Sequence, residues 1–361
     1  MPKPNTFVAD VVALSPPLDR LAAELLRSGP ISVQFARDQV VRLDPSDSRS
    51  ADYAGILDEL RAARQPAYIE FDGTTRMIRL LLIPLVSRVL NIVEGDDIAV
   101  ELEHSHARHL LKRANPYFGE FLGILRDAQA KRSWVAVTDD RHEVIDARPH
   151  AAPSEQLPSG PSEPRRTGPE RLWWRLIDWL RCLLLCFRCV SAKKAKDMFD
   201  LAATQTCNPV SAPVPCIPFL YPDNGCWARA HEMCRLMIAA GAHPRKVWIS
   251  GFLHVNTRNN PQCYVEWIWH VAPTLCVRTS LFAIEDRVID PSLFTSPVSK
   301  QTWKSVQSAT ATLTDSDWTL YRRPAETDPG YTKTKIDLQT YRTALKVRSA
   351  NDGPPPYANC P

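Results

Sequence analysis

A segment rich in proline and polar residues divides this chain of 361 residues. Residues 149–170 (PHAAPSEQLPSGPSEPRRTGPE) have no apolar periodicity, which is typical of a linker. Two other properties change nearby. All ten cysteines lie between Cys182 and Cys360. Residues 1–150 carry 19 Lys and Arg against 22 Asp and Glu, whereas the rest of the chain carries 25 against 18. We therefore expect a folded unit on each side of the linker.

The part before the linker, residues 1–148, is predicted to be a mixed α+β unit. Apolar residues recur at helical spacing in some of its stretches and alternate, as in strands, in others. Asp72 and Gly73 stand between two alternating stretches and predict a tight hairpin turn. The expected elements are helices at 18–26, 107–114 and 117–130, strands at 31–35, 97–102 and 134–137, and a hairpin over 67–82.

Composition excludes several classes of protein. Hydrophobic residues make up 44% of the chain and charged residues 23%, which is the usage of a folded globular protein. With 13 glycines and no G-x-x-x-x-G-K-[ST] pattern, a glycine-rich phosphate cradle is not expected. A net charge of +4 does not suggest a nucleic-acid partner.

The first residues, Met1–Phe7, do not show the basic and then apolar stretch of a Sec signal peptide. The starting expectation is therefore a cytoplasmic protein whose cysteines are reduced. Export by another route, or peripheral association with a membrane, stays open.

Residues 172–190 (LWWRLIDWLRCLLLCFRCV) predict an amphipathic helix within a Trp- and Cys-rich segment at 171–199. Fifteen of these 19 residues are apolar, and the charged ones are Arg175, Asp178, Arg181 and Arg188. Three interpretations stay open: a helix packed on the second unit or a partner chain, a helix on a membrane surface, and a membrane span. The charges argue against the span, because each costs up to about 3 kcal/mol at the bilayer centre.

Cys182, Cys186 and Cys189 follow the C-x3-C-x2-C spacing of the cluster ligands in radical-SAM enzymes. The flanking sequence shows neither the loop nor the repeated βα units of those enzymes. On a helix the three thiols share one face, which favours S-acylation or simple packing over an iron–sulfur site.

A second cluster consists of His104, His106 and His109. No cysteine or carboxylate completes a zinc set with them at the usual spacing. The three histidines are therefore expected at a solvated helix start, and no metal site is predicted.

Residues 221–238 (YPDNGCWARAHEMCRLMI) combine turn residues with a helical pattern. Asn224 and Gly225 predict the turn, so that Cys226 falls in the first turn of the helix. The N–H groups and positive partial charge at a helix N-terminus lower the pKa of a thiol and can hold an oxyanion. Cys226 is therefore a candidate nucleophile, whereas His231 is expected to be structural.

Two later stretches supply the partners that a cysteine nucleophile needs. Residues 265–272 (VEWIWHVA) alternate as a strand that carries His270, and residues 287–294 (RVIDPSLF) end a strand at Asp290. Cys, His and Asp in this chain order are the arrangement of papain-like and transglutaminase-like enzymes. In that arrangement the histidine takes the thiol proton and the aspartate orients the imidazole.

Residues 218–303 resemble the protein-glutaminase (protein-glutamine deamidase) family of bacteria. The resemblance rests on the motifs GCWARAH at 225–231, WHVA at 269–272 and IDPSLF at 289–294. Family members resemble secreted proenzymes with a signal, a propeptide and disulfides. This chain shows no signal and has no cysteine in its first half, so their location and autoinhibition do not carry over.

The resemblance implies hydrolysis of protein-bound glutamine to glutamate with release of ammonia. Cys226 would form the thioester, His270 would be the base, Asp290 would orient it, and no metal or organic cofactor would be needed. The flanking Trp227, Trp267 and Trp269 are candidates for the walls of a narrow substrate pocket. The alternatives are a transglutaminase or cysteine protease with the same triad, or a membrane-docked binding module on an inactive enzyme fold.

The second half is expected to contain a catalytic domain at 200–330 and an extension at 331–361 with a frayed, proline-rich tail. The catalytic core is expected to be papain- or transglutaminase-like, with the cysteine-bearing helix packed on an antiparallel sheet that bears the histidine and the aspartate.

Overall fold

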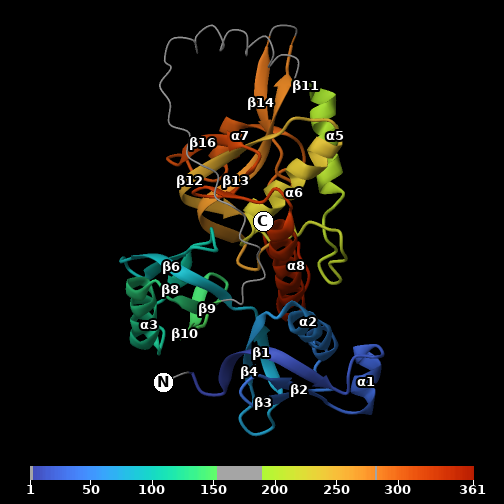
Figure 1. Cartoon of the computed structure of the whole chain (residues 1–361), viewed down its shortest axis with the longest axis vertical. Helices are drawn as coiled ribbons and strands as arrows, with labels where there is room; N and C mark the ends of the chain where they lie inside the picture. Colours follow the sequence, from blue (N-terminus) through green and yellow to red (C-terminus); the bar gives the residue numbers. More distant parts are fainter. Residues whose placement is uncertain (1–2, 153–188, 281–282) are drawn as a thin grey trace.

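The computed structural model of the chain describes residues 3–152, 189–280 and 283–361 (Figure 1). Most of the predicted linker at 149–170 and of the predicted helix at 172–190 lies outside these ranges, so the three interpretations of that helix stay predictions. Among the described residues, no helix combines the length and the apolar character that a membrane crossing requires. The fold belongs to the mixed α+β class and contains several sheets.

The first sheet has five antiparallel strands in the order β3-β2-β1-β4-β5, covered by two helices. Its elements are β1 (Thr6–Ser15), α1 (Ala22–Ser28), β2 (Ile31–Phe35), β3 (Gln39–Leu43), α2 (Ser50–Ala63), β4 (Pro66–Phe71) and β5 (Ile78–Leu82). The predicted hairpin is confirmed as β4 and β5, but its turn is longer than the tight Asp-Gly turn expected. The Asp72 carboxylate holds it by accepting hydrogen bonds from the N–H groups of Thr74 and Thr75.

The next five strands close into a barrel in the order β10-β8-β7-β6-β9. This order, with a helix between the third and fourth strands along the chain, is that of an OB-fold. The elements are β6 (Leu85–Val93), β7 (Ile98–Leu102), β8 (His109–Leu111), α3 (Phe118–Lys131), β9 (Trp134–Asp140) and β10 (Glu143–Pro149). The unit predicted at 1–148 thus contains two sheets, each with its own core.

The prediction of a helix at 107–114 is wrong, because part of this stretch forms the strand β8. Its two end residues, His109 and Leu111, are buried on one face while the strand pairs with β7 on one side and β10 on the other. The predicted strands at 31–35, 97–102 and 134–137 and the helix at 117–130 are confirmed within a few residues.

The second half is built on a sheet with the strand order β15-β14-β13-β12-β16, and β11 pairs with β13. The strands are β11 (Val190–Ser191), β12 (Arg245–Asn256), β13 (Tyr264–Arg278), β14 (Ile284–Val288), β15 (Val298–Ser299) and β16 (Thr312–Asp317). The other elements are α5 (Ala192–Ala203), α6 (Cys226–Ala239), α7 (Lys300–Ser305), β17 (Leu320–Arg322), β18 (Glu326–Thr327) and α8 (Thr332–Asp352). The helix predicted after Gly225 is α6, and it packs against β13.

The last helix, α8, connects the two halves of the molecule (Figure 1). Leu338 and Tyr341, near its start, are buried in the core around α6, whereas Val347, two turns later, is buried in the core of the first sheet. Side chains of α8 and α2 also bond directly, as in the ion pair of Lys346 with Glu59. The halves that the linker separates in sequence are therefore in contact in the fold.

Three disulfides occur among the described residues: Cys189–Cys276, Cys207–Cys216 and Cys263–Cys360. They differ from the reduced thiols that the sequence led us to expect. Cys189 therefore does not join an iron–sulfur set, while Cys182 and Cys186 lie outside the described residues.

The frayed tail predicted at the C-terminus is instead held in place. Cys360 is bonded to Cys263, and the N–H of Tyr357 donates to the carbonyl of Arg258 at 2.7 Å. Both Tyr357 and Cys360 are buried. The proline-rich composition suggested fraying. The structure differs because the tail bonds to a loop that is distant in sequence, and such bonds leave no pattern in the residues near the tail.

A buried ion pair holds α8 beside the start of α6. The Arg348 guanidinium donates to Asp223 at 2.8 Å, and Asn260 donates to the same carboxylate at 2.7 Å. Burial alone would raise the pKa of Asp223, but the charge of Arg348 outweighs it and leaves the pKa lowered. This contribution to stability is therefore present above the unfolded pKa, near 3.8, and is lost as the pH falls below it.

We expect Arg348→Ala to lower the free energy of unfolding by about 3–5 kcal/mol at neutral pH, because Asp223 is left buried without its counter-charge. Urea unfolding measures the change. Lys193→Ala is the control, since the pair of Lys193 with Asp197 is exposed on α5 and should contribute less than about 1 kcal/mol. An equal effect of the two substitutions would contradict this account.

Candidate active site

The candidate nucleophile, Cys226, is the first residue of α6, as the sequence predicted. Gly225 before it adopts a left-handed conformation with φ 81°, and a Cβ at this position would overlap the ring of Tyr341. Only glycine therefore allows both the sharp turn and the close approach of α8. The turn places the Cys226 thiol, which is not in a disulfide, at the helix N-terminus, where it is 1% exposed.

The two other predicted catalytic residues lie together on the neighbouring sheet. His270 is on β13, and Asp290 follows the end of β14. The imidazole Nε2 donates to Asp290 Oδ2 at 2.9 Å, and both side chains are buried. The His270 imidazole also lies beside Cys226, with a ring nitrogen and Sγ within 4.8 Å. The fold thus brings together all three residues that the sequence singled out.

Further hydrogen bonds fix Asp290. Trp303 Nε1 donates to Oδ2 at 2.9 Å, and the Ser292 N–H donates to Oδ1 at 3.2 Å. Burial by itself would raise the pKa of Asp290. The electrostatic interaction with His270 and the hydrogen bonds from His270 and Trp303 outweigh burial, so the pKa is lowered, which favours the ionised carboxylate. An ionised aspartate can hold His270 with its Nε2 protonated and its Nδ1 turned towards other groups.

The pKa of Cys226 differs from the sequence-based expectation. Burial raises it to about 12, although the nearby Arg229 guanidinium and the N–H groups of Val271 and Trp227 oppose the shift. The expected lowering is therefore wrong for this arrangement, because loss of hydration exceeds the effect of the helix N-terminus. Cys226 is a protonated thiol here.

Alkylation of the full-length chain should report this pKa. We expect iodoacetamide to modify Cys226 slowly at pH 7, with a rate that rises about tenfold per pH unit up to at least pH 9, since only the thiolate reacts. Cys234, whose pKa burial also raises to about 12, should behave in the same way. Mass spectrometry of peptides measures both thiols, with the denatured chain as reference. Rapid modification of Cys226 alone at pH 7 would contradict the raised pKa.

The three tryptophans proposed as pocket walls surround the catalytic positions. Trp267 stacks on His270, with ring centroids 4.5 Å apart, and Trp227 donates from Nε1 to Asp337 at 2.6 Å. Both are fully buried core residues. Trp269 is half-buried and packs between Trp227 and Trp248. Substrate binding by these residues stays a prediction.

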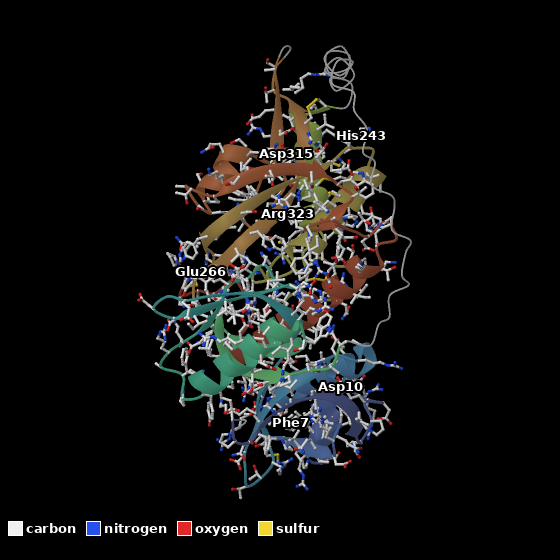
Figure 2. All side chains as sticks on the ribbon, turned by 60° about the vertical axis from the view of Figure 1, so that its left-hand side comes forward. Phe7, Asp10, His243, Glu266, Asp315 and Arg323 are labelled. Atoms are coloured by element: carbon white, nitrogen blue, oxygen red, sulfur yellow. A yellow bond between two sulfur atoms is a disulfide. The ribbon has the colours of Figure 1, made fainter. Side chains whose placement is uncertain are left out.

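A segment of the part of the chain before the linker, which we call the barrel half because it contains the barrel, covers this site. The carbonyl of His106 accepts from the N–H of Ile268 at 2.9 Å, and the N–H of Arg108 donates to the carbonyl of Glu266 at 3.0 Å. Residues 106–108 thus add a short antiparallel strand beside β13, with Ala107 opposite Trp267. In Figure 2, Glu266 lies where the second-half sheet meets the barrel. This covering segment, residues 105–108, occupies the edge along which a peptide could approach His270.

Side chains of the covering segment reach the candidate catalytic residues. The His106 ring lies beside the rings of both Trp267 and His270, with centroid distances of 5.2 and 5.9 Å. Asn224, two residues before Cys226, donates to Ser105 Oγ at 3.0 Å. The solvated helix start predicted for this stretch is therefore wrong. His106 is fully buried, and burial lowers its pKa well below its ordinary value.

Three further residues of the site were not predicted from the sequence. Arg229 lies in the quoted GCWARAH motif, and its Nη1 donates to the carbonyls of Asn224 and Tyr221 at 2.6 and 3.0 Å. This fixes the turn before the nucleophile. The residues near Trp303 show no pattern that predicts its contact with Asp290. His106 stood out in the sequence only as a member of the histidine cluster.

One region of the chain matches a known protein family. Residues 195–307, which contain the Cys-His-Asp set, match the family model described as glutaminase. The match supports the assignment of this region to a glutaminase family of enzymes. No protein of curated function matches the sequence closely enough to count as a relative.

Solved structures similar to this chain are also protein-glutaminases. A pro-protein-glutaminase is 20% identical, with 76% of this chain and 97% of that chain covered and a TM-score of 0.47. A mutant of pro-protein-glutaminase is 22% identical, with 71% and 91% covered and a TM-score of 0.47. Protein-glutaminase from Chryseobacterium proteolyticum is 28% identical, with 48% and 97% covered and a TM-score of 0.39.

Proposed function

We propose that this protein hydrolyses the side-chain amide of protein-bound glutamine, with Cys226 as nucleophile, His270 as base and Asp290 as the residue that orients it. The observation that carries the proposal is the buried hydrogen bond from His270 to Asp290 beside the thiol at the start of α6. In this proposal the helix bearing the cysteine and the antiparallel sheet bearing the other two residues form a papain- or transglutaminase-like core.

The hydrogen bonds support the following role for each atom. Asp290 holds the Nε2–H of His270, so Nδ1 is free to take the proton from Cys226 as Sγ attacks the amide carbon. Backbone N–H groups at the start of α6 stabilise the tetrahedral oxyanion. Protonated His270 then gives its proton to the departing ammonia, and a thioester remains. Water, deprotonated by Nδ1, cleaves the thioester to glutamate and restores the thiol.

The three disulfides support a compartment in which disulfides persist, rather than the cytoplasm expected from the N-terminal sequence. We therefore place the folded enzyme in an oxidising environment. Docking on a membrane through residues 172–190 is a separate proposal, supported by the apolar residues and tryptophans of that segment.

Ammonia release and the intact mass of a glutamine-rich protein test the proposed reaction. The assay needs a chain whose covering segment has been displaced, because that segment occupies the edge of β13. A deamidase releases ammonia and replaces the NH2 of the side-chain amide with OH. The substrate mass therefore increases by the difference between these two groups for each glutamine converted. Incorporation of an added amine would identify a transglutaminase, and fragments would identify a protease. If the uncovered chain produces none of these changes, the site is not an enzyme site and the binding-module alternative holds.

A further inference from the structure

The buried centre of the candidate active site contains more hydrogen-bond acceptors than donors. His106 Nδ1 donates to the carbonyl of Trp269 at 2.9 Å, so its Nε2 carries a lone pair. His270 Nε2 donates to Asp290, so in the neutral imidazole its Nδ1 carries a lone pair too. Neither lone-pair nitrogen has a hydrogen-bond partner among the described residues, and both are buried. The thiol of Cys226, which faces both, has a single proton to donate.

One of the two imidazoles is therefore left without a donor. An unsatisfied buried acceptor costs about 1–3 kcal/mol, and here it lies at the centre of the site. The conflict arises only because His106 enters with the covering segment. Without it, the thiol and His270 form an ordinary donor and acceptor pair. A cation bound by all three atoms would satisfy both lone pairs at once.

The three atoms have the spacing and chemistry of metal ligands. A ring nitrogen of His106, a ring nitrogen of His270 and Cys226 Sγ all lie within 4.8 Å of one another, and the ring nitrogens without a hydrogen-bond partner are His106 Nε2 and His270 Nδ1. Ligand atoms of tetrahedral zinc stand roughly 3.3–3.7 Å apart, so the side chains need to close by about 1 Å. Imidazole nitrogen and thiolate sulfur are the ligands that zinc prefers in proteins.

The surrounding groups are those that orient metal-binding histidines. A bound imidazole usually donates its other N–H to a carbonyl or a carboxylate, which fixes the tautomer and the ring. His106 has the Trp269 carbonyl in this position, and His270 has Asp290. Asp290 is held in turn by Trp303. Both rings are thereby set with their lone pairs directed into the site.

We propose that His106, Cys226 and His270 form a site for Zn²⁺ in the full-length chain, with a water molecule as the fourth ligand. On binding, the S–H bond of Cys226 breaks, its proton goes to solvent and a bond from Sγ to zinc forms, with no change of oxidation state. The covering segment supplies one ligand and α6 and β13 supply the others. The metal therefore joins the barrel half to the catalytic half.

This site has a consequence for activity that rests on the proposed function. Zinc would occupy both the sulfur that attacks the amide and the nitrogen that takes its proton. The enzyme would stay inactive while zinc is bound, and displacement of residues 105–108 would remove one ligand and weaken the site. Zinc binding itself does not depend on whether the enzyme hydrolyses glutamine.

Cobalt substitution tests the site directly. The full-length chain is prepared with Cys182→Ser and Cys186→Ser, because these thiols could bind metal independently, and is titrated with Co²⁺ and then Zn²⁺. We expect about one Co²⁺ per chain, with a thiolate-to-cobalt charge-transfer band that Zn²⁺ abolishes. His106→Ala and Cys226→Ala should each remove the band. Each should also weaken zinc binding. The loss should exceed the roughly 10- to 100-fold that substitutions of residues outside the ligand set cause.

Matched controls separate ligation from general damage. His104→Ala alters another histidine of the same stretch, and Cys234→Ala alters the other buried thiol of α6, so both should keep the band. If His106→Ala does not fold by circular dichroism, His106→Gln replaces it. No band in the parent chain, or a band that survives in the folded His106 or Cys226 variants, would overturn the proposal. The cobalt spectrum involves no glutamine substrate, so failure of the deamidase reaction would leave this result unchanged.

Discussion

Alanine in place of Cys226 or His270 is expected to reduce ammonia release at least about a thousandfold, which corresponds to about 4 kcal/mol of transition-state stabilisation. Cys226→Ala removes the atom that forms the thioester. His270→Ala leaves a thiol whose pKa burial raises to about 12, so almost no thiolate forms at neutral pH. Ammonia release from a glutamine-rich protein measures the effect, in a chain whose covering segment has been displaced.

The double variant distinguishes a catalytic unit from two independent losses. If Cys226 and His270 act together, the double variant should be hardly worse than either single variant. Asp290→Asn should retain more activity, since a less well oriented imidazole still reaches the thiol. Cys234→Ala is the matched control, because it removes a buried thiol from the same helix two turns away. Full activity in Cys226→Ala would exclude the proposed mechanism.

The second large effect concerns the covering segment. Ala107→Asp is expected to raise both ammonia release and the alkylation rate of Cys226 at least about tenfold. Ala107 is 2% exposed and lies opposite Trp267, so a carboxylate there would be buried without a partner. That penalty amounts to several kcal/mol and is relieved when the segment leaves the edge of β13. Each 1.4 kcal/mol by which the covered state is destabilised increases the open fraction about tenfold.

The control introduces the same charge at a position where we expect no effect on access to Cys226. Asn91→Asp introduces a carboxylate at an exposed position of the same barrel and should leave alkylation and ammonia release unchanged. Circular dichroism shows whether each variant is folded. A folded Ala107→Asp chain with the alkylation rate of the parent would mean that residues 105–108 do not restrict access to Cys226.

The elements that carry the candidate catalytic residues could be predicted because their signals are local. Asn224 and Gly225 predict a turn, the apolar spacing after Cys226 predicts a helix, and the alternation around His270 predicts a strand. These patterns depend on neighbours within a few residues, and the structure contains the corresponding elements in α6 and β13. The chain order of Cys, His and Asp then suggested a shared site, and the fold brings them together.

The groups that surround these residues could not be predicted in this way. Trp303 reaches Asp290 because α7 packs beside β14, and Cys263 pairs with Cys360 across 97 residues. Neither contact has a pattern in the sequence near either partner. The pKa of Cys226 could not be predicted from the sequence either, because it depends on how completely the rest of the chain excludes water from the thiol.

The sequence by itself determined the helix that begins at Cys226, the strand that carries His270 and the resemblance to a known enzyme family, since each rests on short stretches of residues. Only the tertiary structure decided that residues 106–108 form a strand beside Glu266 and that His106 faces the catalytic thiol. Their local pattern resembles a helix, but that preference amounts to tenths of a kcal/mol per residue. Pairing with a strand some 160 residues away and burial of the imidazole outweigh it, because they act on many groups at once.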